Sequence, residues 1–356
     1  MSGPLLLSIE SSCDETGVAL VDGGRRIVSN VVASQVALHA PSGGIVPELA
    51  ARAHLRWIVP SLDEAWDGAG VSWSDVGAIA VTYGPGLAGS LLVGINFAKA
   101  LAWVHDKPLV AVNHLEGHVY AAWLLDPGED EARKVEPIFP LVALVVSGGH
   151  TFLAEMTDHL TYRLLGTTVD DAAGEAFDKV GRLLGLGYPG GPAIQQAADG
   201  AVRRNVRFPR AWMGDSYDLS FSGLKTAARR IVADARADAG LADDPEAPLP
   251  AEVNAELAWG FQDAVIDVLA TKTARAAREV GARSIVLGGG VAANRCLRET
   301  LAARADELDV PLIVPRPGLC TDNGAMIGAA GARRFAAGER AALDLDARPS
   351  LPLARR

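Results

Sequence analysis

Short apolar runs bounded by turn residues recur along the chain and predict buried strands. They lie at residues 5–9, 17–21, 78–82, 109–112, 141–146, 284–287 and 312–314. Two longer stretches, 89–105 and 255–280, have the length and composition of helices and alternate with these strands. This mixture predicts an α/β fold rather than an all-α or all-β fold.

Two segments, Leu5 to Val21 and Leu141 to Glu155, follow the same plan. In each, an apolar run leads into a small polar turn and then into a second apolar run. Such turns expose backbone N–H groups and hydroxyls, which suit a phosphate group. We therefore expect two similar domains, each beginning with a β-hairpin, that hold a nucleotide in a cleft between them. A chance likeness of two short segments is the alternative.

Length and charge narrow the class of protein. A chain of 356 residues is typical of two domains, and a hydrophobic fraction of 49% is enough for sizeable cores. The net charge of −10 argues against a protein that coats nucleic acid non-specifically. It leaves an RNA substrate open, because binding depends on a local basic patch. The best candidates for such a patch are Arg203, Arg204, Arg207, Arg210, Lys225, Arg229 and Arg230.

No segment predicts a signal peptide or a membrane span. The apolar start at Leu5 runs directly into Glu10. The longest apolar segment, Gly86 to Val104, contains Asn96 and Lys99, so a buried helix is the better interpretation. The three cysteines form neither a C-x-x-C pair nor a disulfide framework. We therefore expect a cytoplasmic protein with reduced thiols and no membrane contact.

Two polar segments interrupt the apolar pattern. Residues 127–137 are rich in charge, and residues 234–253 are rich in Ala, Asp and Pro without apolar periodicity. We expect both to be exposed loops, and the first to mark the passage between the two lobes.

Two histidines, His114 and His118, lie four residues apart in the sequence His-Leu-Glu-Gly-His. On a helix they share one face, at a spacing compatible with one metal ion. Two structural histidines on an amphipathic helix are the alternative. The segment is similar to the metalloprotease motif H-E-x-x-H, but Glu116 comes one residue later than the glutamate of that motif. It lies about 200° around the helix from His114, so a general base facing the metal is not expected.

Three further segments have the residue types of a binding site. The run Gly288 to Asn294 follows an apolar strand, where glycines let a backbone approach a ligand, but it matches neither G-x-G-x-x-G nor a Walker A motif. Asn294 could bond a ribose or a base edge, or only begin a helix. Asp178 and the Gly190-Gly191 turn could hold sugar hydroxyls, or the acidic residues around Asp178 could only favour a helix N-terminus. Asp322 is either an N-cap or an oxygen ligand that completes the two-histidine site.

These segments occur together in one known family. In chain order they are IESSCDET (9–16), HLEGH (114–118), VSGGHT (146–151), DDAAGEAFDK (170–179), YPGGP (188–192), SFSGLK (220–225), GGGVAAN (288–294) and CTDNGAM (320–326). Over residues 5–335 the chain resembles the TsaD family of tRNA N6-adenosine threonylcarbamoyltransferases. Eight ordered motifs are far more specific than any one of them.

The resemblance implies a fold and an activity. The fold is the two-lobed actin/hexokinase/Hsp70-like ATPase fold, an α/β fold with duplicated domains and a central nucleotide cleft. We expect an N-terminal lobe at 1–137, joined by a returning helix at about 322–340, and a C-terminal lobe at 138–321. The implied activity transfers the threonylcarbamoyl group of threonylcarbamoyl-AMP to N6 of adenosine 37, in tRNAs that read codons starting with A, and releases AMP.

The resemblance also implies site residues and partners. His114, His118 and Asp322 match the family's iron ligands, which implies one Fe²⁺ per subunit. Its substrate-binding positions match Val145, Val146, Ser147, Gly148, Gly149, Asp178, Gly191 and Asn294. Archaeal and eukaryotic members have a tyrosine metal ligand at the position of Val145 and tend to have asparagine at that of His150, so the chain resembles the bacterial branch. The implied partners are tRNA, threonylcarbamoyl-AMP and TsaB-like and TsaE-like proteins, the latter an ATPase.

The expected reaction is acyl transfer to an amine, in which the metal acts as a Lewis acid or template. Asp14 or His150 is expected to assist removal of the proton. Three rival functions remain. A small-molecule kinase of the same fold would need a carboxylate base and Mg²⁺. The position of Glu116 argues against a metalloprotease, and a non-catalytic scaffold has no need of the histidines and Asp322.

Overall fold

The computed structural model describes residues 3–125, 128–130, 135–241 and 247–354, and the chain divides into two compact units. Unit 1 consists of Met1–Ile138, Met156–Arg163 and Pro315–Arg356, and unit 2 of Phe139–Glu155 and Leu164–Val314. The apolar pattern does not predict that the hairpin tip Met156–Arg163 groups with unit 1. The predicted lobe limits at 137 and 322 stay our proposal for the domain organisation.

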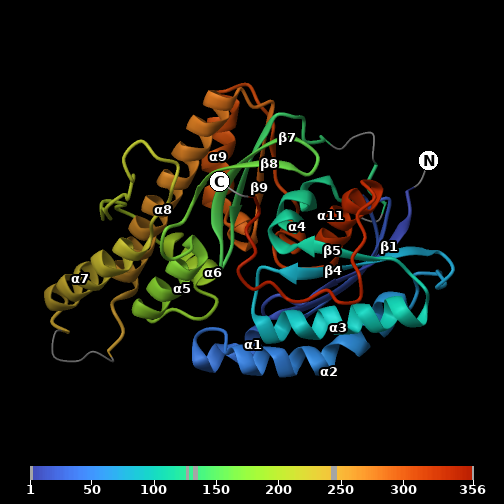
Figure 1. Ribbon diagram of the computed structural model, residues 1–356. Helices are drawn as coiled ribbons and strands as arrows, with labels where there is room; N and C mark the ends of the chain where they lie inside the picture. The colour runs from blue at the N-terminus through green and yellow to red at the C-terminus, as the bar shows by residue number, and fades with distance from the viewer. Residues whose placement is uncertain (1–2, 126–127, 131–134, 242–246, 355–356) are drawn as a thin grey trace. The chain divides into compact units, whose positions relative to one another are not determined.

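Unit 1 is built on a five-stranded sheet with the order β3-β2-β1-β4-β5. Figure 1 labels three of these strands, β1, β4 and β5. Its strands are β1 (Leu5–Glu10), β2 (Glu15–Asp22), β3 (Arg26–Ser34), β4 (Val76–Gly84) and β5 (Leu109–Asn113). β1, β2 and β3 pair antiparallel, whereas β4 runs parallel to β1 and β5 parallel to β4. The apolar runs therefore predicted four of the five strands. β3 was not predicted, because most of its residues are only half-buried and its sequence does not alternate cleanly.

Unit 2 repeats this plan with the order β10-β9-β6-β7-β8. Its strands are β6 (Leu141–Val146), β7 (Thr151–Asp158), β8 (Thr161–Thr167), β9 (Ser284–Gly288) and β10 (Leu312–Ile313). In both sheets three consecutive strands lie side by side, and two later strands extend the sheet from the first strand in parallel. The repeated order confirms the α/β fold and the duplication that the two hairpins predicted.

The helices of unit 1 are α1 (Val36–His39), α2 (Pro47–Trp66), α3 (Ala88–Val104), α4 (His114–Tyr120), α10 (Pro317–Cys320) and α11 (Gly324–Ala336). Those of unit 2 are α5 (Ala173–Leu183), α6 (Gly190–Ala198), α7 (Ser222–Asp238), α8 (Ala251–Val280) and α9 (Arg295–Asp306). α3 and α8 confirm the two predicted helices within a few residues. The loop predicted at 234–253 is wrong at both ends, because α7 continues to Asp238 and α8 already begins at Ala251. Residues 242–246, and 126–127 and 131–134 around the other predicted loop, lie outside the described residues.

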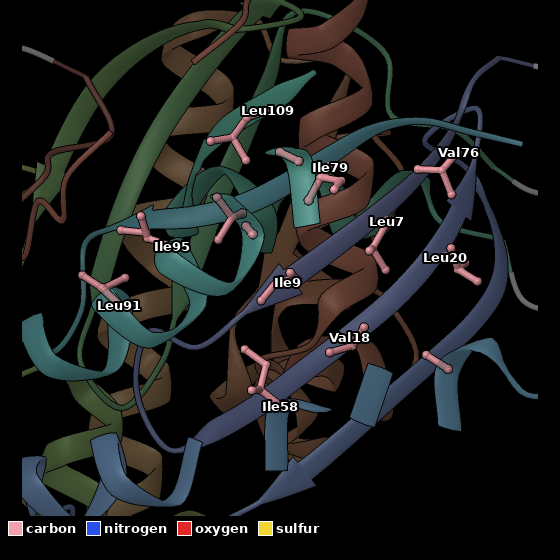
Figure 2. Close-up of a cluster of buried hydrophobic side chains, with 14 residues drawn as sticks. Leu7, Ile9, Val18, Leu20, Ile58, Val76, Ile79, Leu91, Ile95 and Leu109 are labelled. Atoms are coloured by element: carbon pink, nitrogen blue, oxygen red, sulfur yellow. The ribbon is translucent and has the colours of Figure 1, made fainter. Parts of the chain in front are cut away.

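The sheet of unit 1 is buried on both faces, and side chains alternate between them. Leu7, Ile9, Val18 and Leu20 pack with apolar side chains of α2 and α3 in one cluster, as Figure 2 shows. α11 packs on the sheet through small residues. A Cβ at Gly328 would lie 2.6 Å from Val21 Cγ2, and one at Gly324 would lie 2.7 Å from Ala19 N. This close approach brings the start of α11 to the end of the sheet where β1 stops and β2 begins.

Within the described part of the chain, no helix is both long and apolar enough to cross a membrane. The apolar segment from Gly86 to Val104 forms α3, and its buried residues include Leu91 and Ile95. The interpretation of this segment as a packed helix is therefore confirmed.

Candidate metal centre and substrate-binding turns

His114 and His118 lie on α4, which begins directly after β5. Asn113 starts the helix, because its side chain accepts a hydrogen bond from Leu115 N at 2.9 Å. Both histidines are buried, and their ring centroids are 4.7 Å apart. The four-residue spacing therefore puts two imidazoles side by side at the end of the sheet, as the sequence predicted.

Asp322 completes this cluster. Its Oδ1 atom lies 3.2 Å from His118 Nε2 and 3.6 Å from His114 Nε2. One ligand atom from each of the three residues lies within 4.8 Å of the others, a separation that a single metal ion can bridge. The alternative of Asp322 as an N-cap is wrong. Asn323 caps α11 instead, with its side chain accepting from Met326 N at 3.0 Å.

The surroundings of His118 fit a cation. His118 is 1% exposed, and neither of its ring nitrogens has a hydrogen-bond partner among the described residues. A buried imidazole without such a partner is costly unless another group satisfies it. A metal ion at Nε2 would satisfy this atom and the Asp322 carboxylate together. The donor set of two imidazoles and one carboxylate therefore suits a first-row divalent metal ion.

The buried carboxylate of Glu10 contacts the Nδ1 nitrogen of His114. Glu10, at the end of β1, is fully buried, and its Oε2 lies 3.1 Å from His114 Nδ1. The same carboxylate accepts hydrogen bonds from Ser12 N and Thr82 Oγ1, each at 2.5 Å. A carboxylate at Nδ1 holds the proton on that nitrogen and leaves Nε2 as a ligand. Glu10 thus orients His114 toward Asp322.

The charges of His114, Glu10 and Asp322 shift one another's pKa values. Burial lowers the pKa of His114, but the carboxylates of Asp322 and Glu10 outweigh it and raise that pKa to about 9. Burial raises the pKa of Glu10, and the neighbouring His114 outweighs it, so that the net pKa is lowered. The cluster thus places two negative charges beside two imidazoles, and this environment favours a positive charge, either a proton on His114 or a metal ion that replaces it.

Glu116 takes no part in this cluster. Its carboxylate is 1% exposed and accepts two hydrogen bonds from Arg334 of α11, from Nε at 2.7 Å and from Nη2 at 2.5 Å. This bidentate pair joins α4 to α11, the helix that Asp322 precedes. Glu116 therefore has a structural contact rather than the position of a general base.

Asp14 lies in the turn between β1 and β2 and is 8% exposed. Burial raises its pKa, and burial together with Asp14 and Asp322 raises the pKa of the adjacent Glu15 to about 10. His54 of α2 fixes this turn, with Nδ1 2.7 Å from Thr16 Oγ1 and Nε2 2.9 Å from the Cys13 carbonyl. Nothing in the sequence marks His54 for this role, because it occupies an ordinary buried position of an amphipathic helix.

In unit 2, the predicted binding residues Val145 to Gly149 form the end of β6 and the turn after it. Ser147 N donates to the His150 carbonyl at 2.7 Å, and His150 N donates to Ser147 Oγ at 3.1 Å. β9 runs parallel to β6, with Gly288 opposite Val145. The two glycine-rich segments therefore leave neighbouring strands at the same end of this sheet, as expected for a ligand site in an α/β sheet.

Glycines allow these segments to approach each other. Gly289 has a φ of +86°, and a Cβ there would lie 2.4 Å from the Val146 carbonyl oxygen. A Cβ at Gly174, at the start of α5, would lie 2.5 Å from the Ser147 carbonyl oxygen. By contrast, a Cβ at Gly148 or Gly149 would meet nothing within 4 Å. The backbone of this turn is therefore packed against Gly174 and Gly289, while Gly148 and Gly149 face open space.

Asp178 and the glycine pair also come together. Asp178 Oδ1 accepts a hydrogen bond from Gly190 N at 2.7 Å, which fixes the start of α6 on α5. A Cβ at Gly190 would lie 2.4 Å from the Phe177 carbonyl oxygen, whereas one at Gly191 would have open space. Gly190 is thus required for packing, and Gly191 leaves its backbone accessible.

Asn294 is the N-cap of α9, because its Oδ1 accepts from Leu297 N at 3.0 Å. Its Nδ2 donates to Gln262 Oε1 of α8 at 2.8 Å, and both residues are buried. The structure therefore assigns the Asn294 amide a capping contact, while its role toward a substrate stays a prediction. Sequence reasoning missed Gln262 and Glu10, although a carboxylate at the end of the apolar strand Leu5–Glu10 is a signal for the latter.

The comparisons with known proteins agree on one family. The family model for tRNA N6-adenosine threonylcarbamoyltransferase, TsaD, matches residues 26–329. The chain is 56% identical to the tRNA N6-adenosine threonylcarbamoyltransferase of Thermomicrobium roseum, over 99% of this chain and 98% of that protein. It is 47% identical to that of Bacillus subtilis, over 98% of this chain and 95% of that protein.

Solved structures show the fold. HypF of T. kodakarensis superposes with a TM-score of 0.56 at 12% identity, covering 94% of this chain and 48% of that one. Component A of the (R)-2-hydroxyglutaryl-CoA dehydratase of Acidaminococcus fermentans has a TM-score of 0.50 at 17% identity, covering 94% and 99%. These likenesses and the repeated sheets confirm the actin/hexokinase-like ATPase fold. With the family model and relatives at 47–56% identity over nearly its full length, the chain belongs to the tRNA N6-adenosine threonylcarbamoyltransferase family.

Proposed function

We propose that this chain transfers the threonylcarbamoyl group of threonylcarbamoyl-AMP to N6 of adenosine 37 in tRNAs that read codons starting with A. The observation that carries the proposal is the cluster of the buried His114 and His118 with the partly buried Asp322 in a chain of this family, with Glu10 orienting His114. An isolated pair of histidines on a helix would need neither the third ligand nor the buried carboxylate behind it.

The metal of this proposal is one Fe²⁺ ion held by His114, His118 and Asp322. When bound, it supplies a Lewis acid that polarises the carbamoyl carbonyl or anchors the threonyl carboxylate. Glu10 holds a proton on His114 Nδ1, so that Nε2 is the nitrogen that would bind the metal, in exchange for the proton that it carries below the raised pKa of His114. Val145 is an apolar residue of β6 and cannot act as a ligand.

The adenylate would bind to the residues of unit 2. The turn Val145 to Gly149 offers backbone N–H groups to the phosphate, and its open side supports this assignment. Asp178 and the accessible backbone of Gly191 would bind the ribose. Asn294 would hold its segment in place through its cap and Gln262, with any contact to the nucleotide made beside these two bonds.

The chemistry is substitution at an acyl carbon. The N6 nitrogen attacks the carbamoyl carbon and forms a C–N bond, while the C–O bond to the phosphate breaks and AMP leaves with its electron pair. The proton that N6 loses goes to Asp14 or His150. Asp14 suits this role because burial raises its pKa, which makes its carboxylate a better base.

TsaB-like and TsaE-like partners and a cytoplasmic location, where tRNA is found, belong to the same proposal. Exposed apolar side chains on α2 and α3, among them Leu55, Val59 and Trp103, provide surface that a protein partner would cover. The metalloprotease alternative loses its general base, because Glu116 pairs with Arg334. No observation favours the kinase or the scaffold.

Removal of the metal ligands tests the proposal. His114→Ala and Asp322→Ala are each expected to lower the iron content of the purified protein and the yield of N6-threonylcarbamoyladenosine. Iron is measured by elemental mass spectrometry, and the nucleoside by mass spectrometry of digested tRNA after incubation with threonylcarbamoyl-AMP, with and without the partner proteins. His105→Ala and Asp344→Ala, which alter the same residue types outside the cluster, serve as controls. If both ligand variants retain iron and full tRNA modification, the metal assignment is wrong.

A further inference from the structure

A segment of unit 2 without regular secondary structure connects α6 to α7 and is locally basic. Between Ala201 and Gly214 it contains four arginines and no acidic residue, in a chain whose net charge is −10. Three of these arginines, Arg203, Arg204 and Arg207, are exposed. Arg210 differs from them, because it pairs with Asp263 and Asp267 of α8.

The three exposed guanidinium groups form no ion pair within the described part of the chain, although the Glu256 carboxylate accepts backbone N–H groups of the same segment. Among its ion pairs none involves Arg203, Arg204 or Arg207. The Nη1 atom of Arg207 donates to the Arg204 carbonyl at 3.2 Å, which is a neutral acceptor. Three positive charges within five residues therefore face solvent and attract a polyanion.

The backbone of the segment is nevertheless anchored on α8. Arg203 N donates to Glu256 Oε1 at 2.6 Å. A Cβ at Gly260 would lie 2.7 Å from the Val206 carbonyl oxygen, so only glycine permits this approach. Phe208 is 3% exposed and packs edge-on against Phe261, with ring centroids 5.9 Å apart. The arginines thus project from a fixed support, which lowers the entropy cost of binding.

Aromatic and apolar groups accompany these charges. The Arg207 guanidinium lies over the Trp259 ring, 5.3 Å from its centroid. Trp212 is 40% exposed and Val202 is 87% exposed. Trp212 follows the three arginines on the same segment. Exposed aromatic rings on a segment with free guanidinium groups are the combination on which unpaired bases stack, while the guanidinium groups contact the phosphates. A protein partner would be expected to meet a surface with fewer uncompensated charges at its centre.

We propose that residues 202–213, here named the arginine segment, form a docking surface for the tRNA substrate. The inference rests on the proposed function, which supplies an RNA whose target adenosine lies in a single-stranded loop. The guanidinium groups of Arg203, Arg204 and Arg207 contact the phosphate backbone, and Trp212 stacks on an unpaired base.

Charge removal is the first test. The triple variant R203Q/R204Q/R207Q is compared with wild type for direct binding of unmodified tRNA by filter binding at several salt concentrations. Three lost phosphate contacts should lower the slope of log Kd against log salt by about 2 to 3. The variant R52Q/R56Q/R278Q removes the same charge at exposed positions elsewhere and should keep the wild-type slope. The variant R203K/R204K/R207K keeps the charge and should also retain most of the slope. If the three arginines only supported the fold of the segment, both triple variants of the segment would lose tRNA binding.

Stacking is tested by Trp212→Ala, which should weaken binding of tRNA by about 5- to 150-fold and leave binding of fully duplex RNA of the same length nearly unchanged. Equilibrium urea unfolding checks that each variant is folded. An unchanged salt slope in the Gln variant overturns the inference, as does a variant that binds tRNA normally but loses a protein partner. The proposed function is read separately, from nucleoside formation by the wild type. If the wild type binds tRNA but forms no modified nucleoside, the transferase assignment is refuted and the docking surface is not.

Discussion

The buried ion pair between Glu116 and Arg334 links the two helices that position the metal ligands, and its removal has a calculable cost. Arg334→Met keeps most of the aliphatic volume but leaves the Glu116 carboxylate, 1% exposed, without its two charged donors. Loss of one partner of a buried pair costs about 3 to 5 kcal/mol. Since the Arg334 side chain is 20% exposed, water reaches this site in part, and we expect a value of about 3 kcal/mol.

The measurement is equilibrium urea unfolding followed by intrinsic fluorescence. Five tryptophans lie in unit 1, at positions 57, 66, 73, 103 and 123, so the signal mainly reports this unit. Arg333→Met removes the same charge at the preceding position of α11 without uncovering Glu116, and it should stay within about 0.5 kcal/mol of wild type.

The double variant Glu116→Gln/Arg334→Met removes both charges. It should recover at least about 1 kcal/mol relative to Arg334→Met, because the uncompensated carboxylate is gone. If Arg334→Met unfolds within about 0.5 kcal/mol of wild type, or if the double variant is less stable than the single one, the pair does not stabilise unit 1 as argued.

Three other predictions follow from single contacts. Gly190→Ala should lower the free energy of unfolding in a urea titration by about 1 to 3 kcal/mol, because its Cβ would lie 2.4 Å from the Phe177 carbonyl oxygen. The control Gly191→Ala places its Cβ in open space and should leave the free energy of unfolding nearly unchanged. Burial lowers the pKa of His54 below its usual 6.5, so the unfolded chain takes up a proton before the folded chain does as the pH falls. The free energy of unfolding therefore declines below pH 6.5, by up to about 1.4 kcal/mol per pH unit. His54→Gln should flatten this decline between pH 6.5 and 5, and an equal slope in both proteins would contradict the reasoning. Glu10→Gln should weaken binding of Fe²⁺ about 10- to 100-fold in a chelator competition. The amide of the new glutamine would donate to His114 Nδ1 and so move the imidazole proton to Nε2, the ligating nitrogen. A variant with wild-type affinity for Fe²⁺ would refute that tautomer assignment.

Some parts of the site could be predicted from short segments alone. The apolar runs marked both β-hairpins and most strands, because burial in a sheet is written locally as a run of apolar residues between turns. The four-residue spacing of His114 and His118 predicted that both imidazoles share a face of α4. The one-residue displacement of Glu116 from the protease motif predicted that it points away from them, and its pair with Arg334 agrees.

Other parts were decided only by tertiary structure. Asp322 and Asn323 are both good N-cap residues, and the chain's approach to β2, where Gly324 packs on Ala19, settles which of them caps α11 and which faces the histidines. Gln262 meets Asn294 only because α8 packs on α9.

Glu10 shows the division between the two most clearly. Its place at the end of β1 is local and visible in the sequence, but its contact with His114 depends on the order β1-β4-β5, which puts the ends of three parallel strands at one edge. Local chemistry determines which residues form each strand, turn and helix. Which ligand atoms meet depends on strand order and on close packing at glycines, and both are properties of residues far apart in the chain.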